Sequence, residues 1–292
     1  VIFAPYPAYL SLLALRLLRL NRGRRVIADA FLELRSTVVE DRGLLRPGSL
    51  GERLLLAFQR YTLNSAGCVL IDTGAQQALL ADVLRRPPSQ IPVVPVGIDE
   101  TLWTPMPMPA MDGRLKVIFW GTLIPLHGVD VIAEAARYLQ RADAPVDFLL
   151  IGDCQLADHL AAAIARQPLA NLSWERGLLS TGDLRERLAT AHLCLGVFGC
   201  SAKAASVIPY KVHQALASNR TVITRRSPEL SPLVDAELGL FDCEPGDGQA
   251  LAERILEVGE RLRRGWLPST RRIYDREFSH ARLRERLAGI VS

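Results

Sequence analysis

The fold is decided by residues 117–153, which read VIFWGTLIPLHGVDVIAEAARYLQRADAPVDFLLIGD. An apolar run over residues 117–120 is followed by a loop with two glycines and by a stretch whose apolar residues have helical spacing. A second apolar run, residues 148–151, ends in a glycine and an aspartate. Strand, helix and strand in this order predict a β-α-β unit with two parallel strands.

The same alternation continues on both sides of this stretch. Short apolar runs indicate further strands at residues 1–4, 25–28, 68–72, 91–96, 171–174, 193–197, 221–224 and 238–241. Helical spacing indicates further helices at residues 9–20, 50–65, 75–84, 156–166, 183–191, 209–217, 228–234, 248–263 and 272–290. The apolar face of the helix at 50–65 is expected to carry Leu54, Leu55, Phe58, Tyr61 and Thr62. The pattern predicts an α/β protein whose parallel sheets are covered by helices on both faces.

A proline-rich stretch divides the chain. Three prolines between Thr104 and Pro109 exclude a helix or a central strand and indicate an extended linker. We therefore expect one domain over residues 1–110, a second over residues 111–272 and a terminal helix over residues 273–292. Because residues 1–4 already read as an interior strand, we expect the N-terminal domain to be incomplete.

The composition favours a globular protein without a nucleic-acid partner. The net charge of +4 over 292 residues is small, and the only lysines are Lys116, Lys203 and Lys211. The five cysteines are scattered and odd in number, which favours free thiols and a cytoplasmic location. No run reaches the ~18 apolar residues that a membrane span needs.

Ligands of open parallel sheets bind beyond the carboxyl ends of the strands, so the loops there are candidate sites. Gly121 and Thr122 follow one predicted strand, and the glycine allows a ligand to approach the backbone; a plain tight turn explains it equally well. Gly152 and Asp153 follow another strand, where Asp153 either binds a ligand hydroxyl or, as we expect of it taken alone, caps the next helix. Asp29, just past the strand at 25–28, is either a site residue or a cap.

The loop after residues 193–197 carries the strongest signal. Lys203 precedes a helix that begins at Pro209, and Lys211 lies in its first turn. The free backbone N–H groups of a helix start, its dipole and two ammonium groups form a site for a diphosphate. Solvated lysines at an ordinary helix start are the alternative, but the neighbouring residues are small and apolar.

Several other site types are absent from the sequence. No two aspartates lie two residues apart, so there is no D-x-D pair to hold a divalent ion on a diphosphate, and we expect no metal dependence. The sequence lacks the G-x-G-x-x-G loop of nicotinamide enzymes, the H-E-x-x-H and G-x-S-x-G motifs and the P-loop. The five histidines are dispersed, which argues against a zinc cluster.

The order of these segments resembles glycosyltransferase family 4. The likeness spans roughly residues 1 to 290 and is carried by the interdomain stretch 94–105, the loop Phe119–Asp130, the strand end Leu149–Asp153, and Ile208–Ala217 with the strand Thr221–Thr224. The resemblance implies the GT-B fold, in which two Rossmann-like parallel-sheet domains face a cleft. The N-terminal domain would take the acceptor, the C-terminal domain would bind the nucleotide sugar, and the terminal helix would cross back to the N-terminal domain.

The resemblance also implies an activity. Members transfer a sugar from a nucleotide-diphosphate sugar to a saccharide or lipid-linked acceptor with retention, here in cell-envelope or exopolysaccharide synthesis, and they need no cofactor besides the donor. Related enzymes often touch membranes, and a Leu-rich helix followed by basic residues suits contact with the cytoplasmic face of the inner membrane; a solvated helix face is the alternative we favour. The basic residues are Arg16, Arg19, Arg22, Arg24 and Arg25.

Individual roles carry over by position. Catalytic roles fall to Lys203, Lys211 and His127, the last where the family often has a lysine. The donor would be bound by Gly121, Thr122, Gly152, Asp153, Arg176, Gly177, Leu178, Ser206, Val207, Ile208, Pro209 and Gln214. Within this set, Arg176 to Leu178 approach the base and Gln214 the ribose.

The sequence departs from the family pattern at several positions. Ser206 and Gln214 replace the paired glutamates, His127 stands for a lysine, and Asn219 replaces a glycine. A catalytically impaired homologue that serves as a binding or assembly partner is therefore the alternative function. A sugar-nucleotide epimerase of the same two-lobed class is a weaker third reading.

Overall fold

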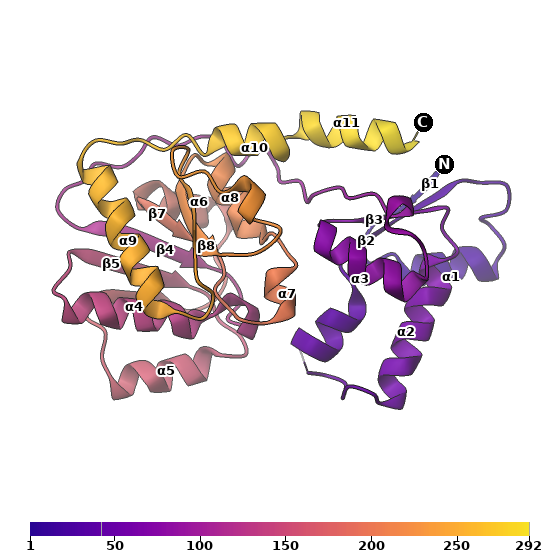
Figure 1. Ribbon diagram of the computed structural model, residues 1–292, viewed down its shortest axis with the longest axis horizontal. Coiled ribbons are helices and arrows are strands. Elements are labelled where there is room, and N and C mark those ends of the chain that lie inside the picture. The colour runs from indigo at the N-terminus through magenta and orange to yellow at the C-terminus, as the bar shows by residue number, and fades with distance from the viewer. Residues whose placement is uncertain (42, 292) are drawn as a thin grey trace. The chain divides into compact units, whose positions relative to one another are not determined.

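The computed structural model describes residues 1–41 and 43–291. These residues form two compact units, each built around its own parallel sheet (Figure 1). Unit 1 consists of Val1–Val96, Ser201–Val207 and the chain from Leu283 onward. Unit 2 consists of Gly97–Cys200 and Ile208–Arg282.

Unit 1 has a three-stranded parallel sheet in the order β1-β2-β3. Its strands are β1 (Ile2–Ala4), β2 (Val26–Phe31) and β3 (Cys68–Ile71). Its helices include α1 (Tyr9–Leu17), α2 (Leu50–Leu63), α3 (Gly74–Leu84) and the short α7 (Ala202–Ala205), with a π-helical segment at Ser36–Asp41. Leu287 and Ile290 of α11 (His280–Val291) pack against the sheet residues Ile27 and Leu70, so the last helix completes this unit.

Unit 2 has a six-stranded parallel sheet in the order β6-β5-β4-β7-β8-β9. Its strands are β4 (Leu115–Trp120), β5 (Val146–Ile151), β6 (Leu172–Glu175), β7 (Leu193–Leu195), β8 (Thr221–Arg225) and β9 (Leu240–Cys243). Its helices are α4 (Val129–Arg141), α5 (Ala157–Arg166), α6 (Thr181–Thr190), α8 (Tyr210–Ala217), α9 (Gly248–Arg263) and α10 (Arg271–Glu277). The predicted α/β architecture with parallel sheets is confirmed.

Alternate residues of β4 point to opposite faces of this sheet, as a strand requires. Val117 and Phe119 belong to the core that includes α4, α5 and α9, whereas Ile118 and Trp120 belong to the core that includes α6, α8 and α10 (Figure 1). Because both faces are covered, the strands of unit 2 read as nearly continuous apolar runs.

The proline-rich stretch is extended, and unit 2 holds it in place. Arg220 is fully buried, and its guanidinium donates hydrogen bonds to the carbonyl oxygens of Met106 and Pro107. The same guanidinium donates to the carbonyl oxygens of Leu188 and Ala189. A buried arginine with this many acceptors satisfies its donors and fixes the path of the stretch.

Two predicted elements are wrong because prolines interrupt them. Residues 91–96 do not form a strand. Ile71 of β3 makes two backbone hydrogen bonds with this stretch: its N–H donates to the carbonyl of Pro92, and its carbonyl accepts from the N–H of Val94. Pro92 and Pro95 have no N–H to continue a ladder. Residues 228–234 form only a short 3₁₀ turn, Ser231–Leu233, with Pro232 in its first positions.

Two further details of the prediction are corrected. Asp29 lies inside β2 rather than past its end, at an irregularity where its carboxylate accepts the N–H of Phe31. The terminal helix is broken into α10 and α11 around Phe278 and Ser279. No described helix is both long and apolar enough to cross a membrane.

The buried face of α2 also differs from the prediction. Leu54 and Tyr61 are exposed, whereas Glu52 and Gln59 are buried. Glu52 accepts hydrogen bonds from the N–H of Gly48 and from Arg35, so polar partners outside the helix decide which face turns inward.

Candidate functional site

The strand order of unit 2 has a topological switch point between β4 and β7. The chain runs outward from β4 to β5 and β6 and then returns to the other side of β4 to form β7, β8 and β9. The loops after the neighbouring strands β4 and β7 therefore lead away to opposite sides. Ligands of doubly wound sheets bind at such a switch point, beyond the carboxyl ends of the strands.

Three predicted site residues of unit 2 meet after β4. Gly121 has a φ of +142° and its N–H donates to the carbonyl of Ile151. A Cβ placed on Gly121 would lie 3.0 Å from Lys211 Nζ and 3.1 Å from His127 Cε1. The missing side chain of Gly121 therefore leaves room for the lysine and the histidine at the backbone of this loop.

Lys211 is buried, and no described residue supplies a counter-charge to it. Its side chain rises from the first turn of α8 to place Nζ 3.8 Å from the centre of the Phe119 ring. Only 6% of the residue is exposed, and Nζ has no hydrogen-bond partner among the described residues. Burial lowers the pKa of Lys211 well below its usual value. An amine in this situation gains most from an anionic ligand.

His127 is oriented by its own loop. It ends a 3₁₀ turn, Pro125–His127, and its Nδ1 hydrogen-bonds to the carbonyl of Thr122. That carbonyl accepts only, so Nδ1 carries a proton. The edge of the imidazole also packs against Phe119, with ring centres 5.5 Å apart. Phe119 is thus a shared support for Lys211 and His127.

The start of α8 offers backbone N–H groups. Pro209 is the N-cap of this eight-residue helix, and no described side chain caps it. Gln214, one turn further on, accepts a hydrogen bond from Trp120 Nε1 at 3.0 Å. The helix dipole adds a partial positive charge where Lys211 already lies.

The loop after β5 lies tightly against the loop after β4. Gly152 has a φ of +148°, and a Cβ there would lie 1.9 Å from the carbonyl oxygen of Gly121. Asp153 does not cap α5, whose N-cap is Leu156, so that expectation is wrong. The Asp153 carboxylate instead accepts the N–H of Cys154 and pairs with Arg176 at 3.2 Å. Arg176 thereby lowers the pKa of Asp153.

The loop after β6 presents the predicted base-binding residues. The Arg176 guanidinium lies 5.2 Å from the Trp174 ring, and the neighbouring Gly177 has open space on its Cβ side. Leu178 is 82% exposed. An exposed apolar side chain beside a glycine is accessible to the flat ring of a ligand.

The remaining predicted residues lie between Lys203 and Ile208, and all but Ile208 belong to unit 1. Lys203 lies in α7 and is buried. Ser206 donates to the carbonyl of Lys203 at 3.0 Å, and its own carbonyl accepts from Thr73 Oγ1 at 2.6 Å. Gln76 Nε2 also donates to the Ser206 hydroxyl at 2.5 Å. Val207 ends this segment, and Ile208 begins the next part of unit 2.

Sequence reasoning missed two residues of the unit 2 site. Phe119 was placed in a predicted strand without a role in the site, and its ring lies beneath Lys211. Arg225 ends β8; it is buried, and its guanidinium donates to the carbonyl of Gly199 after β7. Both lie at carboxyl ends of strands next to the switch point, and the strand-end rule applied to every strand would have found them.

These features place a buried lysine, a histidine and a helix start at the switch point of a doubly wound sheet, and comparison with known proteins identifies the class. Residues 114–260 match the sequence pattern of the family described as Glycosyl transferases group 1. The chain belongs to this family. No curated protein gives a significant match over the chain.

Solved structures of low sequence identity share the fold. HepE from Anabaena, in complex with UDP and glucose, matches with a TM-score of 0.72 and 16% identity over 98% of this chain and 75% of its own. Sucrose-phosphate synthase from Thermosynechococcus elongatus matches with a TM-score of 0.73 and 17% identity over 99% and 72%. A glycosyltransferase from Rickettsia africae matches with a TM-score of 0.63 and 12% identity over 98% and 96%. The predicted GT-B fold is confirmed.

Proposed function

We propose that this glycosyltransferase takes its sugar from a nucleotide-diphosphate sugar and binds the diphosphate beside Gly121, Thr122 and the start of α8. The observation that carries the proposal is Lys211, whose buried ammonium group has no partner among the described residues and lies at the Gly121 backbone. The complex of HepE with UDP and glucose supports a nucleoside diphosphate as the ligand.

The proposed chemistry is stabilisation of a leaving group. As the bond from the sugar to the diphosphate breaks, negative charge grows on the departing oxygen. Lys211 and the dipole of α8 would stabilise this charge in a site from which water is excluded. His127 would add a hydrogen bond, and Lys203, assigned by its position in the sequence, a second ammonium group.

The remaining assignments extend this proposal. Arg176, Gly177 and Leu178 would receive the base, Gln214 the ribose, and Gly152 and Asp153 would shape the phosphate loop. Ser206, Val207, Ile208 and Pro209 would line the sugar side. The acceptor would be a saccharide or a lipid-linked saccharide of the cell envelope or an exopolysaccharide, with the anomeric configuration retained and no metal required.

The proposal is tested with a panel of nucleoside diphosphates and differential scanning fluorimetry. The nucleoside diphosphate with the matching base should stabilise the protein by about 2.7 kcal/mol when its free concentration is a hundred times its Kd. The same shift in the presence of EDTA would support metal independence. If no nucleoside diphosphate stabilises the protein, the proposed donor site is wrong.

A catalytically impaired homologue remains a second candidate because Ser206 is already engaged by Gln76 and by the carbonyl of Lys203. This reading expects nucleotide binding without turnover. Release of sugar from the radiolabelled donor, with or without acceptor, would decide against it.

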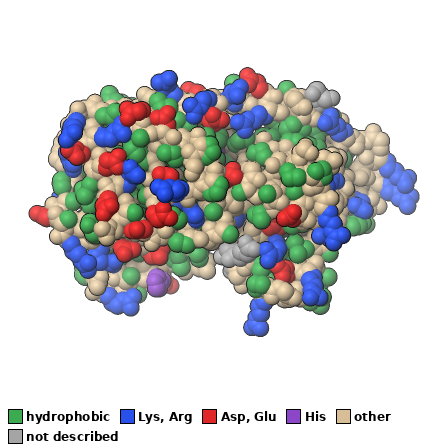
Figure 2. Space-filling view, viewed as in Figure 1, with side chains coloured by type: hydrophobic (Ala, Val, Ile, Leu, Met, Phe, Trp, Pro, Cys, Tyr) green, Lys and Arg blue, Asp and Glu red, His purple; other side chains and the backbone are tan. Residues whose placement is uncertain are grey.

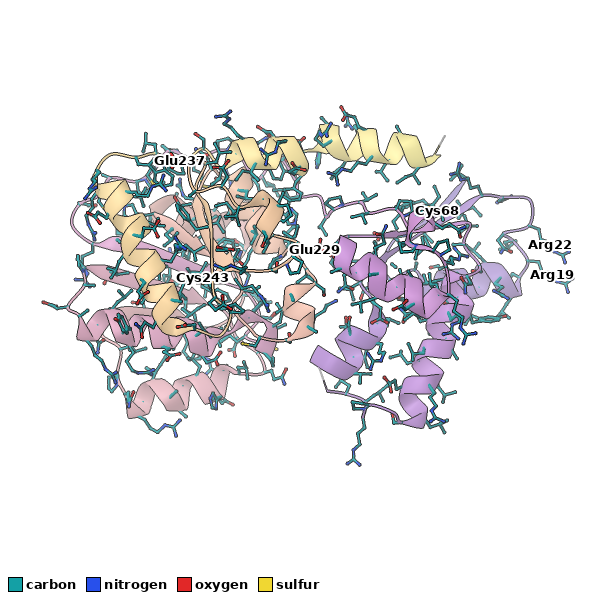
Figure 3. The ribbon with its side chains drawn as sticks, in the orientation of Figure 1. Arg19, Arg22, Cys68, Glu229, Glu237 and Cys243 are labelled. Atoms are coloured by element: carbon teal, nitrogen blue, oxygen red, sulfur yellow. The ribbon has the colours of Figure 1, made fainter. Side chains whose placement is uncertain are left out.

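We further propose contact with the cytoplasmic face of a membrane through the end of α1. Leu10, Leu17 and Leu18 are each at least 66% exposed. Exposed arginines follow them, and Figure 2 shows basic side chains gathered at this end of the molecule. Arg19 and Arg22 extend outward (Figure 3). Exposed leucines beside arginines match an anionic lipid surface.

Replacing Arg19, Arg22 and Arg24 by serine should weaken binding to phosphatidylglycerol vesicles about a hundredfold, because each basic residue near such a surface contributes about 1 kcal/mol. Cosedimentation measures the effect. A control with Arg53, Arg141 and Arg166 changed to serine removes equal charge from exposed positions elsewhere. Equal binding by both variants, or none by the wild type, would favour a solvated helix face.

A further inference from the structure

A second cavity lies within unit 2, outside the proposed donor site. Its volume is about 460 Å³, which is in the range of small-molecule sites. It lies between α4 and α5, which neighbour each other in Figure 1, and residues 198–200 after β7 also line it. Most of the wall is apolar and consists of Val129, Ala133, Leu156, Leu160, Ala163 and Phe198.

The polar groups of the cavity include one without a partner. Nε of Arg137 is buried and has no hydrogen-bond partner among the described residues. The other polar side chains on the lining are those of Asp130, His159 and Cys200. Asp130 lies two turns before Arg137 on α4, so the lining carries one acidic and one basic group on the same helix. A buried guanidinium nitrogen without an acceptor favours a ligand with a carboxylate or a similar anionic group.

We propose that this cavity binds a small free molecule with an apolar body and one anionic group. The body would lie against Phe198, Leu156 and Leu160, and the anion would accept a hydrogen bond from Arg137. The apolar area removed from water would supply most of the affinity, and the arginine would select charged over neutral molecules.

The cavity is connected to the proposed donor loop by the backbone. Pro125 lines it, and the N–H of Phe198 donates to the carbonyl of His127 at 3.1 Å. The N–H of Gly199 likewise donates to the carbonyl of Leu126 at 3.2 Å. A ligand that moves Phe198 would therefore move His127. This consequence, unlike the cavity itself, rests on the proposed donor site.

The test uses fluorescence of anilinonaphthalene sulfonate, which has apolar rings and one anionic group, and its displacement by decanoate. Ala163→Trp fills the cavity and should weaken binding of both at least tenfold. Ala162→Trp places the same ring on the adjacent exposed position of α5, outside the lining, and should bind like the wild type. If the two tryptophan variants bind equally, or the wild type does not bind, the cavity is not a ligand site.

A second pair of variants tests whether Arg137 binds the anionic group of the ligand. Arg137→Met keeps the length of the side chain and should weaken decanoate about tenfold while leaving decanol unchanged. Arg141→Met, on the exposed side of the same helix, should change neither. Equal loss for decanoate and decanol would overturn the role of Arg137.

A measurement on the wild type does not depend on variant folding. Cys154 and Cys200 are both exposed thiols, but only Cys200 lines the cavity. Decanoate should slow maleimide labelling of Cys200 at least fivefold and leave Cys154 unchanged; equal rates at Cys200 would contradict the site. UDP affinity measured with and without decanoate then tests the connection to His127, and an unchanged affinity would overturn that connection alone.

Discussion

Lys211→Met should make the protein more stable and, at the same time, weaken nucleoside-diphosphate binding by about a hundredfold. The amine is buried against Phe119 without a partner among the described residues, so it lacks the hydrogen bonds that compensate burial. Methionine has nearly the same shape and no charge, and we expect a gain of about 1 kcal/mol, or roughly 2 to 4 °C in Tm. The binding loss corresponds to the charge-assisted hydrogen bonds of an ammonium group to phosphate, at ~1.5–3 kcal/mol each.

The matched control is Lys116→Met. Lys116 is an exposed lysine of β4, so the change removes the same charge without burial. Thermal unfolding and calorimetric titration with UDP should find it close to wild type in both respects. A Lys211→Met protein that is less stable than wild type and still binds UDP would show that the lysine is structural.

The difference in stability between wild type and Lys211→Met should depend on pH. An unfolded lysine titrates near ~10.4, whereas burial lowers the pKa of Lys211 in the folded protein. Between the two values the unfolded chain binds more protons, so wild-type stability should rise with pH in this window. The advantage of Lys211→Met should shrink as the pH is raised from neutral toward 10.

The acid limb of the stability profile has a different origin. Burial lowers the pKa of His213 to about 4, so stability should fall as the pH drops below the usual histidine value of ~6.5. Both proteins keep His213, and this loss cancels in the comparison between them. A difference in Tm that does not change with pH above neutrality would contradict the account of Lys211.

The sequence was most informative where structure is local. The β-α-β alternation of unit 2 depends on apolar runs and helical spacing, and the helix expected at 248–263 forms over those residues. The meeting of Gly121, His127 and Lys211 also follows from the sequence, because parallel topology brings strand ends to one edge. Their contact with Phe119 does not, since a strand residue that faces a core reads the same whether or not a lysine covers it.

The errors lie where distant residues decide the outcome. Asp153 turned to Arg176 instead of capping a helix, and that arginine follows another strand. The buried face of α2 was set by Gln59 and Glu52, whose partners lie in other segments. Ser206 hydrogen-bonds to Gln76, 130 residues earlier in the chain. Periodicity reports which residues are apolar, but it carries no information about such partners.

Gly152→Ala should be among the most damaging single substitutions in unit 2. The residue has a left-handed φ of +148°, and an added Cβ would lie 1.9 Å from the carbonyl oxygen of Gly121. Because the obstacle is backbone, rotation of a side chain cannot relieve it. Backbone strain of ~1–3 kcal/mol and the forced shift of the neighbouring loop together should cost roughly 3 to 5 kcal/mol.

Gly113→Ala separates strain from collision. Gly113 also has a left-handed φ, of +107°, but a Cβ there would meet nothing within 4 Å. This control should lose only ~1–3 kcal/mol and keep its UDP affinity. Denaturant unfolding and UDP titration of both variants give the comparison, and equal losses of stability would show that the collision is relieved at little cost.

The same collision should also be visible in binding. Gly152→Ala pushes on the Gly121 carbonyl, and the space on the Cβ side of Gly121 is already limited by Lys211 Nζ and the His127 ring. A displaced Gly121 therefore changes the positions of both groups proposed to hold the diphosphate, and we expect at least a tenfold loss of UDP affinity in the molecules that remain folded. An unstable variant with normal UDP affinity would separate the packing of Gly152 from the donor site, because the diphosphate would then not depend on where the Gly121 backbone lies.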